Sequence, residues 1–174
     1  MVVRTLGVGI ARVRFSAARQ DQFMDKTKNK YLYPIKVTSG VRITYDESPA
    51  HVAGLKNSVD FICNEGTEVR ASADGIVVDL KSDSNIGGPD KGFEPFGNFI
   101  EIKHDNEEYS EYEHLKEAGV LIAVGERVTK GQLIGYTGAT GWLAHLGPHL
   151  HFMVGIYGNS DEDYKTVEVV WEDK

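Results

Sequence analysis

The stretch GPHLHFMVGIY (147–157) decides how this chain folds, because its residues alternate in the manner of a β-strand. Side chains point in turn to opposite faces of a strand, so His149 and His151 share one face while Leu150 and Phe152 share the other. Two imidazoles side by side on one face indicate a metal site or a proton-transfer site. A carboxylate and a further histidine are the groups that would complete such a site.

The rest of the chain is typical of a β-rich protein. Glycine occurs 19 times and proline 5 times in 174 residues, and short apolar runs are separated by Gly, Asn and Asp. Long stretches with helical periodicity are scarce. A hairpin is expected around Asp105-Asn106, since this turn-forming pair separates two alternating runs. Strands are expected in the segments 67–80, 96–104, 108–115, 131–138, 149–157 and 166–172.

Two further features bear on the architecture. Residues 83–98 contain four glycines and two prolines, which indicates a long surface loop suited to wall a binding groove. Residues 65–77 and 124–135 both place Gly-x-x-Val ahead of a glycine-bounded apolar run. This shared spacing indicates either a duplicated hairpin unit or turn chemistry that arose twice.

Composition limits the classes of function. With 41% apolar and 26% charged residues, a chain of 174 residues fits one domain that can bury a core. The net charge of -7 has the wrong sign for nucleic acid or an anionic membrane, so neither is expected as a main partner. The apolar piece at residues 5–11 is interrupted by arginine too early for a membrane span. The single cysteine, Cys63, excludes an intramolecular disulfide and leaves His and carboxylate side chains as metal ligands.

A carboxylate and a histidine elsewhere in the chain are candidates to join the pair. Asp60 lies at the start of an apolar strand, where an ionisable side chain needs a partner, a metal or the backbone N–H groups of a strand end. His114 ends a strand in which alternation puts Tyr112 and His114 on one face. His114 is alternatively a surface residue beside two glutamates.

Four motifs occur in order along the chain, namely NSVDFICNEGTEVRASADGIVV, YEHL, VGERVTKGQLIGYTGATG and GPHLHF. Together they resemble the LytM or lysostaphin type of zinc metallopeptidase, and the resemblance covers about residues 34–156. It implies a mostly β fold, an antiparallel sandwich or barrel-like hybrid of duplicated hairpins with a narrow groove and few short helices. The chain would then consist of an N-terminal arm or strand at residues 1–33 and a LytM-like metallopeptidase domain at residues 34–174.

The resemblance also implies roles for individual residues. The aspartate of the DF motif, Asp60, and the second histidine of His-x-His, His151, would be zinc ligands. The first histidine of that pair, His149, and the histidine of YEHL, His114, would flank the reaction centre. Either of these two would act as the general base, because no glutamate stands in a His-Glu-x-x-His pattern.

One position departs from the family pattern. The usual first ligand is a histidine four residues before the aspartate, where this chain has Lys56, and a protonated amine cannot bind zinc. Either the site is inactive or another histidine replaces the missing ligand. We assign His51, nine residues before Asp60, as the third ligand.

The resulting hypothesis is a Zn²⁺-dependent endopeptidase that hydrolyses peptide bonds in bacterial peptidoglycan cross-links by a metal-activated water assisted by His114 and His149. A LytM-like module that binds or activates a partner without catalysis is the main alternative. A lipoyl- or biotinyl-type carrier, prompted by VGERVTKGQLIG, lacks a suitable exposed lysine and leaves Asp60 and both strand histidines unexplained. The family usually works outside the cytoplasm, so the resemblance implies an extracellular or cell-envelope location; it implies no oligomeric state.

Overall fold

The structure is a computed structural model that describes residues 26–45, 51, 53–143, 146–158 and 163–172. Most of the expected N-terminal arm, residues 1–25, therefore lies outside the described residues. The strands are β1 (Arg42–Thr44), β2 (Val59–Ile62), β3 (Glu68–Arg70), β4 (Gly75–Lys81), β5 (Gly87–Gly88), β6 (Phe99–Lys103), β7 (Glu108–Glu113), β8 (Leu115–Val120), β9 (Arg127–Val128), β10 (Leu133–Thr137), β11 (Gly141–Trp142), β12 (His149–Ile156) and β13 (Lys165–Thr166). The short 3-10 helices are η1 (Ala53–Leu55), η2 (Lys91–Phe96) and η3 (Asp105–Glu107).

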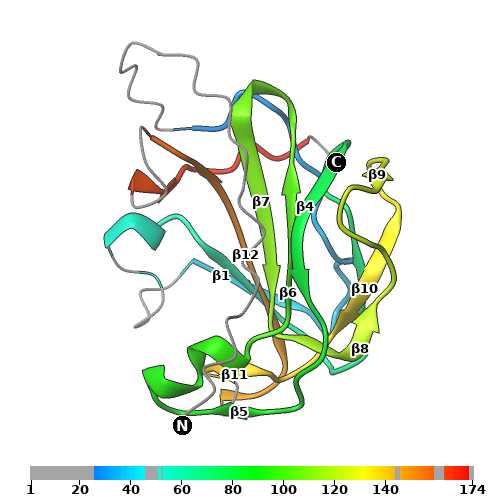
Figure 1. The fold of residues 1–174 in the computed structure, drawn as a ribbon, viewed down its shortest axis with the longest axis vertical. Helices are drawn as coiled ribbons and strands as arrows, with labels where there is room; N and C mark the ends of the chain where they lie inside the picture. The colour runs from blue at the N-terminus through cyan, green and yellow to red at the C-terminus, as the bar shows by residue number, and fades with distance from the viewer. Residues whose placement is uncertain (1–25, 46–50, 52, 144–145, 159–162, 173–174) are drawn as a thin grey trace, which may run out of the picture.

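The main sheet has the strand order β1-β2-β12-β7-β6-β4-β9, with β13 paired to the far end of β12 (Figure 1). All of its strand pairs are antiparallel. A smaller antiparallel sheet has the order β3-β10-β8, and β5 and β11 form a short parallel pair. The expected mostly β, antiparallel fold with few short helices is confirmed. Within the described ranges, no helix combines the length and the apolar character needed to cross a membrane.

One hydrophobic core joins the two larger sheets. Phe61 from β2, Phe152 from β12 and Tyr112 from β7 are fully buried, and the ring of Phe152 lies 5.2 Å from that of Tyr112 and 6.5 Å from that of Phe61. Val69 of β3 and Ile134 of β10 belong to the same buried cluster. Burial of these side chains is the main favourable term that holds the sheets together.

Most expected strands are present, but two differ. The segment 67–80 is two strands, β3 and β4, because at Ser72 the backbone N–H donates to the hydroxyl of Tyr112 instead of continuing a ladder. The segment 166–172 is a strand only at its start, in β13. Beyond β13, Glu168 forms an isolated parallel bridge with Lys26, and Trp171 forms one with Tyr31. This stretch therefore pairs with residues 26–31 and not with a strand of the sheets.

The expected turns are also visible. The hairpin between β6 and β7 turns at Asn106, whose φ of 61° lies in the left-handed region that asparagine tolerates. The loop at 83–98 contains β5 and η2, so it is more ordered than a simple surface loop. In the repeated Gly-x-x-Val spacing, Gly66 and Gly125 have φ values of 81° and 87°, and each precedes a buried valine by three residues. The spacing therefore encodes the same glycine turn twice.

A buried histidine ties the hairpin to its neighbour. The Nδ1–H of His104 donates to the carbonyl of Asp74 at 2.7 Å, and its Nε2 accepts from the hydroxyl of Ser110 at 2.7 Å. These two bonds fit the neutral ring, because a carbonyl only accepts. Burial lowers the pKa of His104 below 6.5, and the opposing carboxylates of Asp74 and Asp105 only partly offset that effect.

This histidine makes the stability of the metal-free protein depend on pH. The unfolded chain takes up a proton on His104 at a higher pH than the folded chain does, so the stabilisation is present above about pH 6.5 and decreases as the pH falls below it. We expect the free energy of unfolding to fall more steeply between about pH 7.5 and about pH 5.5 in the wild type than in His104→Gln. Urea unfolding at several pH values measures both slopes, and equal slopes would contradict the assignment.

Candidate active site

The register between β2 and β12 creates the centre of the site. His151 lies directly opposite Asp60, and the side chains of such a pair share one face of the sheet. The Nδ1 atom of His151 is 2.8 Å from Oδ1 of Asp60. Phe61 and Leu150, also opposite each other, point to the other face and are fully buried in the core. The alternation visible in the sequence is therefore present in the fold.

His51 joins this pair from the segment that precedes η1. Its Nε2 lies 3.3 Å from Nδ1 of His151 and 3.4 Å from Oδ1 of Asp60. The candidate ligand atoms of the three residues all lie within 4.8 Å of one another. His51 is 4% exposed and His151 is 3% exposed, whereas Lys56, at the position of the usual ligand, is exposed. The structure thus brings His51 to the aspartate and leaves Lys56 at the surface.

The charges at this centre are strongly coupled. Burial raises the pKa of Asp60, but its hydrogen bonds to His151 and His51 more than offset this, and the net pKa lies below the ordinary value. Burial lowers the pKa of His151, but the bond to Asp60 and the charge of Glu113 outweigh it, and the net pKa is raised. Both shifts favour the ion pair of an ionised Asp60 with a protonated His151 when no metal is bound. A cation bound there would replace that proton.

The donor set fits zinc. Two imidazole nitrogens and one carboxylate oxygen converge from three elements, and this combination is a common ligand set of catalytic zinc sites. Three protein ligands leave one coordination position for water or substrate. Asp60 has 16% of its side chain exposed, so the centre is accessible from solvent on that side.

Two further histidines lie next to this centre. His149 shares the strand face of His151, and its Nδ1–H donates to the carbonyl of Gly147 at 2.9 Å. The Nδ1–H of His114 donates to the carbonyl of Thr140 at 2.7 Å. The ring of His114 is centred 4.6 Å from that of His149 and 5.9 Å from that of His151. All five residues selected from the sequence are therefore together in the folded chain.

The prediction that His114 shares a strand face with Tyr112 is wrong. Continued alternation after Tyr112 would point His114 into the core, where Tyr112 lies against Phe152. Instead β7 ends at Glu113, and His114 has a φ of 62°, in the left-handed region. This turn of the backbone brings the imidazole to the face of His149 and His151.

Glycines and a long loop close the site around His114. Gly141 has a φ of 84°, and a Cβ built on it would lie 2.7 Å from Cα of Gly97 and 3.6 Å from Nδ1 of His114. No other residue type fits there without displacing the backbone. The loop at 83–98 ends at this contact, and the indole N–H of Trp142 donates to the carbonyl of Pro89 in the same loop. The loop expected beside a binding site is thus adjacent to His114.

The hydrogen bonds of His114 and His149, here called the two outer histidines, determine which ring nitrogen carries a hydrogen. A carbonyl only accepts, so Nδ1 carries a hydrogen in both rings, and Nε2 is the nitrogen that takes no part in this bond. Burial, reinforced by the neighbouring imidazoles of His149 and His151, lowers the pKa of His114 to about 3. His114 is therefore a neutral ring at physiological pH. The carbonyls of Thr140 and Gly147, which orient these rings, are backbone groups that no side-chain pattern reveals.

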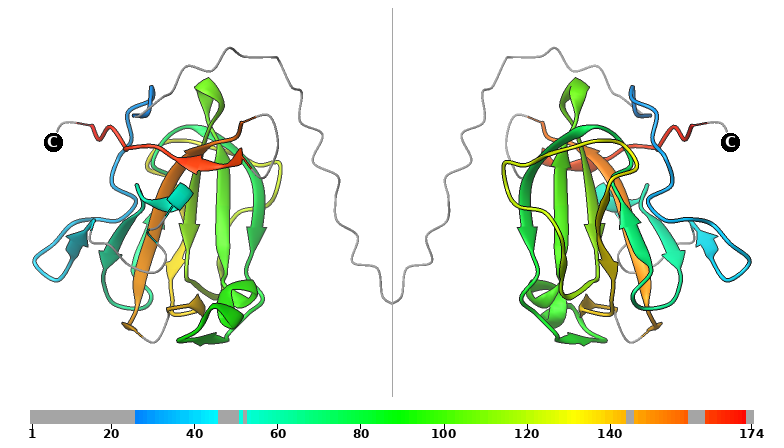
Figure 2. Two further views of the ribbon diagram at one scale, coloured as in Figure 1. Left: turned by 90° about the vertical axis from the view of Figure 1, so that its left-hand side faces the viewer. Right: turned by 90° about the vertical axis from the view of Figure 1, so that its right-hand side faces the viewer.

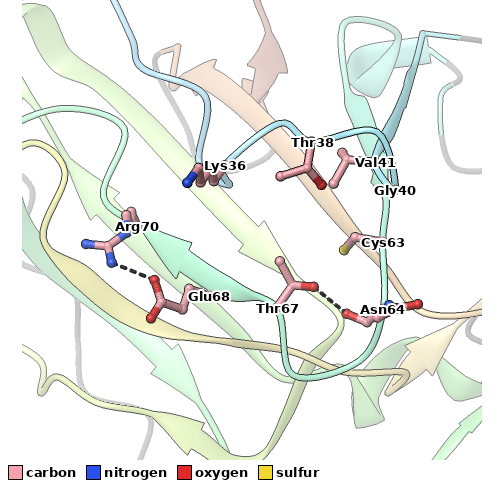
Figure 3. Close-up of a pocket in the computed structure, with 9 residues that line it drawn as sticks. All are labelled: Lys36, Thr38, Gly40, Val41, Cys63, Asn64, Thr67, Glu68 and Arg70. Carbon is pink, nitrogen blue, oxygen red and sulfur yellow. Dashed lines mark hydrogen bonds and ion pairs between the residues drawn. The ribbon is translucent and has the colours of Figure 1, made fainter.

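A cavity of about 280 Å³ lies elsewhere in the molecule (Figure 3). Its lining includes Lys36, Asn64, Arg70 and the buried Cys63, and none of the five site residues belongs to it. Burial raises the pKa of the Cys63 thiol, which disfavours the reactive thiolate form. The convergence of three candidate metal ligands therefore places the candidate active site at the histidines and not at this cavity.

Comparison with known proteins gives a consistent set of matches. The sequence profile of peptidase family M23 matches residues 54–162, more than half of the chain. The peptidoglycan DD-endopeptidase ShyA of Vibrio cholerae is 30% identical over 131 residues, which are 72% of this chain and 27% of that protein. The glycyl-glycine endopeptidase ALE-1 of Staphylococcus capitis is 38% identical over 99 residues, which are 57% of this chain and 24% of that protein.

A solved structure agrees with these matches. The crystal structure of a zinc-containing peptidase from Vibrio cholerae has a TM-score of 0.53 to this chain at 26% identity, over 83% of this chain and 40% of that one. The chain spans only 27% and 24% of the length of the two curated relatives. Both His51 and β13 lie just outside the range that the family profile matches.

The tautomer of His114 can be tested directly. We expect its Nδ1 to be protonated and its Nε2 to be unprotonated from about pH 5 to about pH 8, because burial disfavours the charged ring. Nitrogen-15 NMR of the metal-free protein distinguishes the two ring nitrogens, and His104, with the same Nδ1–H to carbonyl bond, is an internal reference. A protonated Nε2 on His114 in that range would contradict the geometry.

Proposed function

The chain belongs to peptidase family M23, and on that premise we propose that it is a zinc-dependent endopeptidase that hydrolyses peptide bonds in bacterial peptidoglycan cross-links. The observation that carries the proposal is the convergence of Nε2 of His51, Oδ1 of Asp60 and Nδ1 of His151, which lie 2.8 to 3.4 Å from one another. Peptidoglycan endopeptidases among the relatives support the substrate class. Such a substrate lies outside the cytoplasmic membrane, so the proposal includes a cell-envelope or extracellular location.

The proposed ligands are His51, Asp60 and His151. When bound, zinc acts as a Lewis acid that polarises a carbonyl and lowers the pKa of a coordinated water to about 7. Asp60 contributes the one negative charge of the ligand set, so the site keeps a net positive charge with the metal present. The burial of both histidines keeps competing water away and strengthens these interactions.

His114 and His149 would move the proton. Each ring is held through Nδ1 by a backbone carbonyl, so Nε2 is the atom that can accept a proton from the attacking water. The same atom, once protonated, can donate a hydrogen bond to the developing oxyanion or a proton to the leaving amine. The rings lie 4.6 Å apart, so one can act as the base while the other stabilises charge.

The main alternative is a family module that binds without cleaving, and its support is Lys56 at the usual ligand position. Lys56 is exposed, whereas His51 occupies the centre beside Asp60. A module that only binds has no need for two histidines oriented by backbone carbonyls next to a candidate set of three metal ligands. We therefore favour the active enzyme.

Metal content tests the ligand assignment. We expect about one zinc per chain in the wild type and in Lys56→Ala, whereas His51→Ala should bind zinc more than about 100-fold more weakly, because it lacks one of three ligands. Atomic absorption and titration against a chromophoric chelator measure both quantities. Protein refolded with excess zinc that still contains none would rule out the enzyme proposal.

Catalysis tests the two outer histidines separately from the metal. We expect His114→Ala and His149→Ala to retain about one zinc but to hydrolyse cross-linked peptidoglycan fragments about 100- to 10,000-fold more slowly, the usual range for loss of a general acid or base. Release of new amino groups is the readout, and fragments with D-alanyl and with glycyl-glycine linkages distinguish the two bond types. Unchanged hydrolysis in both variants would refute the proposed roles.

A further inference from the structure

The three proposed zinc ligands are not held equally firmly by secondary structure. Asp60 lies on β2 and His151 on β12, and both strands are paired in the main sheet. His51 itself belongs to no strand and lies just before η1. A ligand on irregular backbone needs additional contacts, because sites on loops are less precise than sites on strands.

Those contacts come from one buried threonine of the C-terminal strand β13. The hydroxyl of Thr166 accepts the backbone N–H of Asn57 at 3.1 Å and donates to the carbonyl of Gly54 at 3.0 Å. The backbone carbonyl of Thr166 also accepts the side-chain amide of Asn57 at 2.8 Å. Thr166 is 4% exposed, so these bonds are shielded from water. Three bonds therefore join the segment after His51 to β13.

The strand β13 is in turn fixed to the strand that carries His151. Thr166 lies opposite Gly155 of β12 in antiparallel register. The ring of Tyr164 lies so close to Gly155 that a Cβ there would approach it to 2.3 Å. Figure 2 shows β13 (red) beside η1 (cyan) at one end of the sheet. The segment of His51 is thus tied through β13 to the same strand that presents His151.

The far end of the segment is fixed as well. The backbone N–H and the hydroxyl of Ser58 both donate to the carbonyl of Leu55, at 3.1 and 2.8 Å. Ser58 is 1% exposed and directly precedes β2. Thr166 therefore holds Gly54 and Asn57, and the turn closed by Ser58 and Leu55 connects this segment directly to β2.

We propose that Thr166 and Asn57 are positioning residues for the zinc ligand His51. This inference rests on the proposed function, because it takes His51 as a ligand. In this chain the third ligand comes from a longer segment and not from the position four residues before Asp60. Zinc binding would otherwise have to order that segment, and the lost conformational entropy would lower the affinity. The hydrogen bonds to Thr166 order it beforehand.

The test measures zinc affinity, not activity. Thr166→Val keeps the β-branched shape for the strand but removes the hydroxyl, and Asn57→Ala removes the side-chain amide at a half-buried position. We expect both to bind zinc about 10- to 100-fold more weakly, the usual effect of losing an outer-shell partner. Thr166→Ser, which keeps the hydroxyl, should stay within about twofold of the wild type.

A second threonine offers a matched control. The hydroxyl of Thr137 accepts the backbone N–H of Thr67 at 3.0 Å and donates to the carbonyl of Asn64 at 2.8 Å, and Thr137 is fully buried. It thus has the same bonding roles as the hydroxyl of Thr166, but in the smaller sheet. Thr137→Val should lower the stability of the metal-free protein to about the same extent as Thr166→Val, because both lose a buried hydroxyl. It should leave the zinc affinity unchanged.

Chelator competition gives the affinities, and thermal unfolding with EDTA or with zinc gives the stability of each form. Wild-type affinity in both Thr166→Val and Asn57→Ala would overturn the inference, as would an equal loss of affinity in Thr137→Val. Asn57→Ala remains informative if Thr166→Val fails to fold. If the wild type binds no zinc, or if His51→Ala binds zinc as tightly as the wild type, the proposed function itself fails. If the wild type binds zinc through His51 but Thr166→Val and Asn57→Ala bind it equally well, only the positioning role fails.

Discussion

The antiparallel register of β2 and β12 is the constraint on which the rest of the site depends. It places His151 opposite Asp60 on one face and Leu150 opposite Phe61 on the other. A shift of one residue would turn the side chains of one strand to the opposite face, so that Asp60 would no longer lie beside His151 and Phe61 would leave the core. The burial of Phe61 and Phe152 in the core therefore stabilises the same register that brings the carboxylate within 2.8 Å of the imidazole. The same strand register therefore satisfies both the packing of the core and the geometry of the site.

The site carries features that do not serve stability. His114 holds a left-handed backbone conformation, which costs on the order of 1–3 kcal/mol in a residue other than glycine. Its buried imidazole loses the hydration of the charged form, and its pKa falls to about 3. The carbonyl of Thr140 compensates for part of this cost by accepting the Nδ1–H. A neutral ring held in a fixed orientation is what proton transfer requires, so the strain is consistent with the proposed chemistry.

The proposed third ligand, His51, does not stand at the usual position of the family pattern. At four residues before Asp60 the chain has an exposed lysine, and the imidazole comes from His51 instead. In the proposed arrangement, the segment between His51 and β2 is held by contacts outside the strand pair, and Thr166 of β13 makes hydrogen bonds to Gly54 and Asn57 in that segment. The C-terminal strand thereby becomes part of the support of the site, although none of its residues lies among the candidate ligands.

The sequence by itself determined the strand of 149–157, the shared face of His149 and His151 and the hairpin at Asp105-Asn106, and through the family resemblance it predicted five site residues that the fold brings together. Those inferences rest on short-range alternation, turn chemistry and motif order, which neighbouring residues express directly. Only the tertiary structure decided that His51 reaches Asp60, that His114 leaves the core face through a positive φ, and that segment 166–172 is mostly bridged by residues 26–31. These outcomes depend on contacts between segments far apart in the chain, and no local pattern contains that information.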